Sequence, residues 1–155
     1  MCIRDRYSGV KINGLSGLYT YFLLLSKMWM SEDGVGAWLI PSEFMDVNYG
    51  RAVKEFLVKK VTLCRIHRFD PREPQFGDAL VSSAVVFFKN SCPSPDQKVE
   101  FTFGGTIERP KISGSIKLSN LHTIPKWTAL PQNTSLFTKC RDRSDITLAD
   151  LFTIK

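Results

Sequence analysis

Hydrophobic residues recur between positions 14 and 60 in an order that predicts alternating helices and strands. Leu18, Phe22, Leu25 and Trp29 lie three or four residues apart, which predicts an amphipathic helix over Leu18–Met30. Val35–Ile40 is a hydrophobic run of six residues that ends at Pro41, which predicts a buried strand. Each element is followed at once by turn or polar residues, so this part of the chain is expected to be compact.

A second helix is expected over Tyr49–Lys60, with Asp46 or Asn48 as its cap. Its spacing places five residues on an apolar face: Tyr49, Ala52, Val53, Phe56 and Leu57. Strands are expected at Val61–Ile66 and Leu80–Lys89, separated by a polar loop that contains Pro71, Pro74 and Gly77. The order is therefore helix, strand, helix, strand, loop, strand.

This order predicts an α/β fold. Two strands joined by a helix should run parallel, and two joined by a loop alone should be antiparallel neighbours. The sheet would then end in an antiparallel hairpin over residues 61–89, beside Val35–Ile40. In open α/β sheets ligands bind at the carboxyl ends of the strands, so the loop Pro41–Asn48 is predicted to border a site.

The remaining third of the sequence predicts fewer elements. Asn90–Gln97 is rich in proline and serine and is interpreted as a linker. Val99–Phe103 alternates as a short strand, Gly104 and Gly105 form a turn, and Ser115–Leu118 is a candidate strand. A partial β-rich region is therefore expected after the hairpin.

Charge and cysteine content narrow the possible functions. The formal net charge is +6, and the basic residues Arg51, Lys54, Lys59, Lys60, Arg65, Arg68 and Arg72 are concentrated in one stretch. Such a stretch suits a polyanion, although a solvated helix face would also explain it. The four cysteines form no metal-binding spacing, so no metal site is expected, and they fit a reducing cytoplasm. No apolar run is long enough to span a bilayer.

Four segments in order resemble one enzyme family. They are Gly17-Leu18-Tyr19-Thr20-Tyr21-Phe22, Gly34-Val35 to Pro41-Ser42-Glu43-Phe44, Tyr49-Gly50 to Phe56-Leu57, and Phe76 before Ser83-Ala84-Val85-Val86. Together they resemble the adenine-specific (N6) DNA methyltransferases of the single-chain restriction–modification type. The resemblance implies the carboxyl-terminal half of a Rossmann-like sheet, S-adenosylmethionine as cofactor, and double-stranded DNA as partner. It also implies methyl transfer to an adenine flipped out of the helix, in a prokaryotic cytoplasm.

The sequence departs from the family in what precedes Gly14. The glycine-rich cofactor turn and the Asn-Pro-Pro-Tyr-type tetrapeptide that holds the target amine are absent, so no residue is assigned as catalytic. The start, Met-Cys-Ile-Arg-Asp-Arg-Tyr, resembles a translated sequencing-adapter remnant. We therefore expect an internal fragment with a non-native start (1–13), a partial methyltransferase domain (14–90), a linker (91–97) and the entry to a target-recognition-like domain (98–155). The missing strands should leave one sheet edge and apolar helix faces uncovered.

Four groups of residues are candidates for the site. The resemblance places Phe76 against the flipped base, where the alternative is a loop side chain packed on the core. Pro41, Ser42 and Phe44 are expected to border the pocket or to pack at the strand's end. Tyr19 and Phe22 are weak cofactor candidates, for which core packing is favoured. Arg65, His67 and Arg68 are expected near DNA phosphates, although a lone histidine is more often structural.

Two other functions remain open. The first is a catalytically empty methyltransferase-like domain that serves as a DNA-binding or specificity module. The second is an RNA or small-molecule methyltransferase, since those enzymes share the sheet. Lys126-Trp127 and Ile146–Lys155 resemble the entry to a target-recognition domain and favour DNA.

Overall fold

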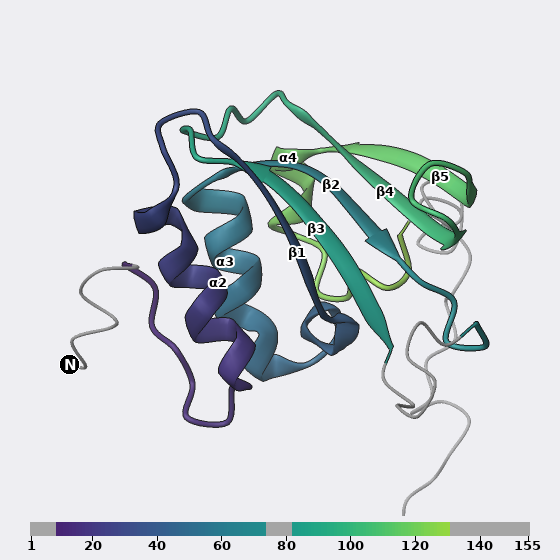
Figure 1. The fold of residues 1–155 in the computed structure, drawn as a ribbon, viewed down its shortest axis with the longest axis horizontal. Helices are drawn as coiled ribbons and strands as arrows, with labels where there is room; N and C mark the ends of the chain where they lie inside the picture. The colour runs from purple at the N-terminus through teal and green to yellow at the C-terminus, as the bar shows by residue number, and fades with distance from the viewer. Residues whose placement is uncertain (1–8, 74–81, 131–155) are drawn as a thin grey trace, which may run out of the picture.

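The described part of the protein is one mixed five-stranded sheet with two helices on one face (Figure 1). The computed structural model describes residues 9–73 and 82–130. The helices are α2 (Leu18–Trp29) and α3 (Arg51–Lys59), with a short α4 (Leu118–Leu121) after the last strand. The strands are β1 (Val35–Pro41), β2 (Thr62–Arg68), β3 (Ser83–Lys89), β4 (Lys98–Gly105) and β5 (Pro110–Lys117). They lie in the order β1-β3-β2-β4-β5.

The hairpin predicted over residues 61–89 is confirmed. β2 pairs antiparallel with β3, and β3 pairs antiparallel with β1 along the whole of β1, from Val35 opposite Lys89 to Pro41 opposite Ser83. β1 and β2 therefore run in the same direction, as their helical connection predicts, but they are separated by β3. The α/β fold is confirmed with it, but the hairpin does not end the sheet, because β4 and β5 continue it beyond β2.

β1 differs from its prediction as a central, buried strand. It lies at one edge of the described sheet, and Ile40 is its one buried residue. The hydrophobic run predicted burial because its two faces are both apolar, which is typical of an interior strand. Within the described residues, helices cover only one of those two faces. β1 also lies at the edge of the sheet, where an uncovered edge was expected.

The third part of the sequence extends the same sheet. β4 pairs parallel with β2, and β5 pairs antiparallel with β4 and forms the opposite edge. Gly104 and Gly105, predicted to form a turn, are the last two residues of β4, and the chain turns just after them, before Pro110. Gly105 has φ +68, and a Cβ there would lie 2.5 Å from the Arg109 carbonyl oxygen, so glycine is required. The strand predicted at Ser115–Leu118 begins earlier, at Pro110.

Helix α3 attaches the sheet to its helical layer. It buries Ala52, Val53, Phe56 and Leu57 of the predicted apolar face, and Val58 as well. Phe56 packs edge-on against Phe88 of β3, with ring centroids 5.8 Å apart. Burial of one such aromatic side chain is worth about 1.5–3 kcal/mol. Neither predicted cap is used, because the residues from Asn48 to Gly50 form a short 3-10 turn and Gly50 precedes the helix without a side-chain cap.

Helix α2 is oriented differently from the simplest expectation. Of the predicted stripe, Leu18, Phe22 and Trp29 are exposed, whereas Leu23 and Leu24 are buried. The helix is hydrophobic around most of its circumference, so the spacing of one stripe could not determine which face meets the core. A helix of that kind is usually covered on more than one side.

Candidate active-site edge

The carboxyl ends of β1 and β2 meet at one edge of the sheet, next to the start of β3. The Ser42 N–H donates to the Ser82 carbonyl (2.8 Å), and the Phe69 N–H donates to the Ser83 carbonyl (3.1 Å). The chain enters α2 and α3 near the same edge, because each helix runs back along the strand next to it in sequence (Figure 1). Positive ends of two helix dipoles therefore lie where ligands of α/β sheets bind.

The three residues predicted to border the pocket lie at this edge at different depths. Pro41 is half-buried at the end of β1, while Ser42 is buried in the 3-10 turn η1 (Ser42–Met45). Phe44 is fully buried and packs edge-on against Trp127, with ring centroids 6.4 Å apart. Phe44 thus anchors the turn in the core, and Pro41 has the most accessible side chain of the three.

Trp127 fastens the segment after β5 to this turn. Its backbone N–H donates to the Met45 carbonyl (3.1 Å), its ring meets that of Phe101 (centroids 6.0 Å apart), and the residue is 1% exposed. The Thr128 hydroxyl donates to the Asp46 carboxylate (2.6 Å). Residues far apart in the sequence therefore hold the predicted site loop in place.

The cofactor candidates Tyr19 and Phe22 lie on different faces of α2. Phe22 is 48% exposed on the outer face, so the expected core packing is wrong for this residue. Tyr19 is half-buried and packs against the core, as expected. Burial raises the pKa of its hydroxyl, and Glu43 and Tyr49 lie close enough to raise it further.

Glu43 and Tyr49 were not predicted as site residues. The pKa of Tyr49 is raised by burial and by a hydrogen bond to Glu43. With Tyr19 they form a small cluster of two phenols and a carboxylate at the ligand edge. The signal was present in the sequence, since Glu43 follows β1 by two residues and Tyr49 precedes α3 by two.

The three predicted phosphate contacts have little free surface. The Arg65 guanidinium donates to the Ile107 carbonyl (2.6 Å) and pairs with Glu100 (3.4 Å). His67 is completely buried, its Nδ1 is hydrogen-bonded to the Thr102 hydroxyl (2.9 Å), and burial lowers its pKa. A buried ring cannot reach a phosphate in this arrangement, which agrees with the structural alternative for His67.

Arg68 lies on the other face of β2 from Arg65 and His67, as strand alternation requires. Its guanidinium stacks over the ring of Phe103, 4.6 Å from the centroid, and burial lowers its pKa. Both arginines are held within the sheet's own contacts.

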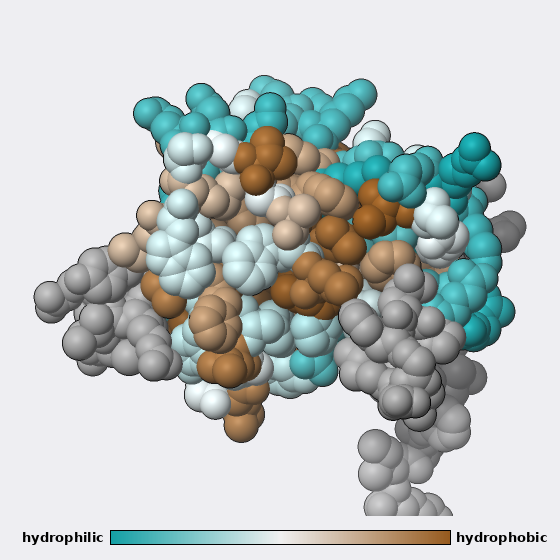
Figure 2. Space-filling view, viewed as in Figure 1, coloured by the Kyte–Doolittle hydropathy of each residue, from teal (hydrophilic) through white to brown (hydrophobic). Residues whose placement is uncertain are grey.

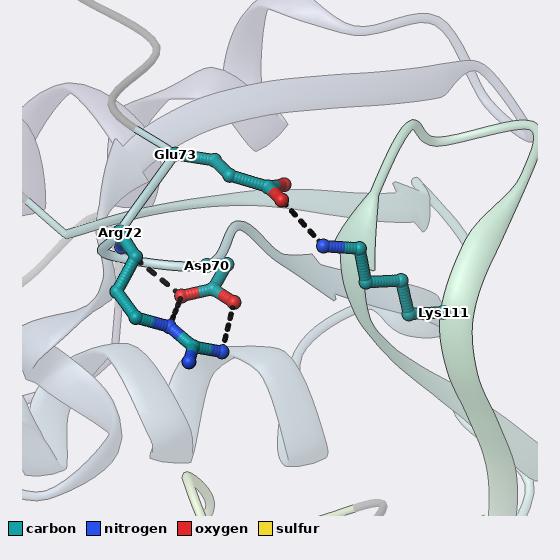
Figure 3. A network of polar contacts seen from close by, with 4 residues as sticks. All are labelled: Asp70, Arg72, Glu73 and Lys111. Carbon is teal, nitrogen blue, oxygen red and sulfur yellow. Dashed lines mark hydrogen bonds and ion pairs between the residues drawn. The ribbon is translucent and has the colours of Figure 1, made fainter.

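An exposed arginine does lie just beyond the end of β2. Arg72 donates to Asp70 through Nε (3.0 Å) and Nη2 (2.7 Å), and its side chain is 85% exposed (Figure 3). Asp70 also accepts the Arg72 N–H (3.0 Å), and these bonds hold the pKa of its carboxyl at about 2. Lys111 of β5 pairs with Glu73 beside it. Arg72 was predicted only as part of the basic stretch, although the sequence Asp70-Pro71-Arg72 is of a kind that forms such turns.

The basic stretch also lines an open cleft between α3 and the segment that follows α4. The cleft has a volume of about 710 Å³ and is bordered by Arg51, Lys54, Lys59 and Lys126, with Asp46 and Glu55 among them. Lys54 donates to the Pro125 carbonyl (2.7 Å), and Lys59 pairs with Glu55 (2.9 Å). Part of the positive charge is therefore internally compensated.

Phe76 lies outside the described residues. The structure shows where its loop leaves and returns: after the Asp70–Arg72 turn and before Ser82, which is bonded to Ser42. The described ranges contain no group of three or more potential metal-ligating side chains. They also contain no helix long and apolar enough to cross a membrane.

No protein-family model matches the sequence. The chain is 41% identical over 91 residues to "Type II methyltransferase M.AccI" of Acinetobacter calcoaceticus, which is 59% of this chain and 16% of that protein. It is 26% identical over 124 residues to "Type II methyltransferase M.XamI" of Xanthomonas campestris pv. amaranthicola, 80% of this chain and 21% of that protein. The fold is similar to that of the type IIG restriction endonuclease BpuSI, with a TM-score of 0.52 and 18% identity over 77% of this chain and 17% of that one.

The two relatives confirm the resemblance to methyltransferases of restriction–modification systems. The methyltransferase-like fold is confirmed by the type I restriction-modification system methyltransferase subunit from Streptococcus thermophilus, with a TM-score of 0.51 and 12% identity over 93% of this chain and 28% of that one. The chain spans about a sixth and a fifth of the lengths of the two relatives.

Proposed function

We propose that the chain is part of a site-specific DNA methyltransferase that transfers a methyl group from S-adenosylmethionine to the N6 atom of an adenine, in restriction–modification. The observation that supports this most is the 41% identity to the methyltransferase M.AccI, together with a mixed sheet whose strands end in a crowded, polar edge. We also propose that residues 14–90 belong to the methyltransferase domain, residues 91–97 to a linker, and residues 98–155 to the entry of a target-recognition-like domain.

The described residues would act by binding and orientation. An exocyclic adenine amine is a poor nucleophile, so much of the rate must come from holding the amine and the methyl donor in line. Pro41, with Tyr19 and Glu43 near it, would form one wall where the base arrives. The sulfonium cofactor supplies the methyl group when bound.

Arg72 is the best candidate among the described residues for a DNA phosphate contact. Its fork is already held by Asp70, so little side-chain entropy is lost when the exposed side of the guanidinium meets a phosphate. Arg65 and Arg68 would contribute positive electrostatic potential near the DNA rather than direct phosphate contacts. His67 is not proposed as a phosphate contact because it is buried.

Phe76 would stack on the extruded adenine. Its loop leaves the sheet after the end of β2 and returns at Ser82, which is bonded to Ser42 at the carboxyl edge, where a flipped base would be received. Stacking on an aromatic ring is worth about 1–3 kcal/mol per base. Loss of the ring would make extrusion less favourable, and another aromatic ring would restore it.

The test uses M.AccI in which the segment that corresponds to residues 9–130 of this protein is replaced by those residues. With labelled S-adenosylmethionine and unmethylated DNA, the chimera should transfer label, and mass spectrometry of the digested DNA should find N6-methyladenine. The isolated 155-residue chain should give background counts. Label found on cytosine would contradict the adenine assignment, and a folded chimera that binds DNA without transferring label would favour the DNA-binding module.

Within the same chimera, Phe76→Ala should reduce both methylation and the fluorescence rise of 2-aminopurine at the target base. Phe76→Trp should retain much of both, because any aromatic face serves. If the alanine variant flips and methylates as the unaltered chimera does, Phe76 is a packing residue.

A further inference from the structure

The cleft between α3 and the segment that follows α4 is formed by residues that are distant in the sequence. In Figure 1 that segment runs beside α3, on the side away from α2, and Lys54 of α3 donates to the Pro125 carbonyl (2.7 Å). The volume of about 710 Å³ lies within the range of ligand pockets. The fold therefore brings two basic segments of the chain to the walls of one cleft.

The walls of this cleft are charged rather than apolar. None of the exposed large hydrophobic side chains of the described residues lines it, because they lie over α2, β1 and the residues that flank them, where Figure 2 shows hydrophobic surface. The cleft instead holds four cations and two carboxylates, which are Arg51, Lys54, Lys59 and Lys126, with Asp46 and Glu55. This excess of positive charge favours an anionic ligand.

Two of the four cations are left free by the protein's own contacts. Lys59 pairs with Glu55 (2.9 Å), and Lys54 is bonded to the carbonyl of Pro125. Arg51 and Lys126 are exposed, and neither has a hydrogen-bond or ion-pair partner within residues 9–73 and 82–130. One lies on α3 and the other on the facing segment, so a ligand between the walls can contact both without breaking an existing interaction.

The position of Arg51 is unfavourable for the stability of its own helix. Arg51 is the first residue of α3, the first turn holds no acidic residue, and Gly50 provides no side-chain cap. The positive end of the helix dipole favours anions at this position and disfavours a cation. A residue that opposes a local rule without a compensating contact is expected where function requires it.

The wall opposite α3 contributes an unused hydrogen-bond donor. Trp127 borders the cleft and is 1% exposed, and its indole Nε1–H has no partner among the described residues. Buried donors of this kind are uncommon, so the indole indicates an acceptor that the protein itself does not supply. Lys54 lies over the same ring, 5.7 Å from its centroid. Burial lowers the pKa of Lys54, although Asp46 opposes the shift, so an anion nearby would stabilise its charged form.

We propose that this cleft binds the sugar–phosphate backbone of DNA beside the target site, with Arg51 and Lys126 as phosphate contacts and the Trp127 indole as a neutral donor. Contacts of this kind fix the position of a protein on DNA without reading its sequence. That the phosphates belong to DNA rests on the proposed function.

The cleft is continuous with the predicted site loop, which favours DNA over an acidic peptide as the ligand. Asp46, Val47 and Asn48 of that loop border the cleft, and the backbone N–H of Trp127 is bonded to the Met45 carbonyl at the end of η1. α3 begins at the carboxyl edge and runs back along the sheet (Figure 1). A DNA strand that reaches the carboxyl edge can therefore continue along the cleft.

The experiment measures DNA affinity against salt concentration for the full 155-residue chain and for the M.AccI chimera, by fluorescence anisotropy of a labelled duplex. Arg51→Ala with Lys126→Ala should weaken binding and reduce the slope of log affinity against log salt by about two, since each lost phosphate contact contributes about 0.9. The loss should be equal for duplexes with and without the methylation site. Arg51→Lys with Lys126→Arg keeps both charges and should keep the slope.

Trp127→Phe separates the neutral donor from the charges. It should weaken binding at an unchanged salt slope, because it removes an N–H and no charge. Lys89→Ala with Lys98→Ala is the matched control for the cleft pair. Both lysines are exposed at the opposite edge of the sheet, at the end of β3 and the start of β4, so the same charge is removed away from the cleft. The control should leave the slope unchanged, and thermal melting checks that each variant is folded.

Equal reductions of the slope by the cleft pair and the control pair would assign the effect to net charge and overturn the inference. Unchanged binding by the cleft pair, or unaltered proteins that do not bind DNA, would overturn it as well. A melting temperature lowered by the cleft pair alone, with DNA binding intact, would assign the cleft to another part of the protein and has the same consequence. A chimera that shows the expected slopes but transfers no methyl group counts against the proposed function and not against this cleft.

Discussion

The two edges of the sheet present opposite solutions to the same physical problem. Any edge strand exposes unpaired backbone groups that invite another strand. β5 meets this with Lys111 and Lys117 pointing outward, whereas β1 presents Val35 and Leu39 beside the apolar outer face of α2. The difference indicates that β5 is built to face water and β1 is built to be covered.

Both strands belong to one sheet and pack on the same core, so the contrast does not come from local instability. β1 is paired with β3 over all seven of its residues, and β5 with β4 over most of its length. What differs is the chemistry of the side chains that pairing leaves free. An edge can be well formed within the protein and still be incomplete as a surface.

The sharpest contrast in stability should lie between the two faces of α2. Leu23→Ala removes a fully buried side chain and should cost about 2–5 kcal/mol of unfolding free energy. Leu18→Ala, on the outer face, should stay within about 0.5 kcal/mol. Urea unfolding of the two variants measures the difference, and equal losses would mean that the outer face already supports the core.

Converting the polar edge into an apolar one should create a second adhesive surface. Lys111→Val with Lys117→Val removes the two edge lysines and their ion pairs with Glu73 and Asp96. We expect larger assemblies by light scattering at equal concentration, with little change in melting temperature. Lys111→Arg with Lys117→Arg keeps the charge and should behave as the unaltered chain; unchanged scattering of the valine variant would break the comparison.

Acidification should weaken the interior of the sheet before it affects either edge. Burial lowers the pKa of His67 below its ordinary value of 6.5, so the unfolded chain binds a proton that the folded chain does not. Stability should therefore fall as the pH drops below about 6.5 toward the lowered pKa. His67→Gln should flatten this part of the curve measured by urea unfolding, and a slope that persists would assign it to another group.

The smallest effect is expected at the charged network beside β5. Asp70 has a pKa of about 2, so its bonds to Arg72 stabilise the fold above the ordinary aspartate pKa and are lost only as the pH falls through about 2. Asp70→Asn should therefore lower stability slightly at neutral pH and remove the dependence between pH 4 and 2. The same variant should weaken DNA binding by the chimera, because Arg72 would lose its orientation. Arg72→Lys tests this separately, since it keeps the charge without the fork.

The sequence predicted the elements better than their surroundings. The spacing of Ala52, Val53, Phe56 and Leu57 identified the inner face of α3, because the opposite face is charged. α2 has apolar residues on both sides, so spacing alone could not choose between Leu18 and Leu23 as the core residue. The run Val35–Ile40 was read as buried for the same reason.

The position of the site in the fold could be predicted from the sequence, but the roles of its individual side chains could not. The loop after β1 does lie at the carboxyl edge, yet Phe44 turned out to be an anchor for Trp127, a contact across more than eighty positions that no local pattern reveals. Arg65, His67 and Arg68 looked alike as charges, but their partners Ile107, Thr102 and Phe103 come from β4 and the turn after it. Contacts with residues distant in the sequence therefore decide which basic side chains are accessible to DNA. Arg72 pairs only two residues away, with Asp70, and its side chain stays 85% exposed.

Amide hydrogen exchange tests the difference between the two edges most directly. The β1 amides that are not bonded to β3 should exchange rapidly in the isolated chain and become protected in the chimera with M.AccI. The outward amides of β5 should exchange at the same rate in both proteins. Protection of β1 in the isolated monomer, or equal protection of β1 and β5 in the chimera, would contradict the account.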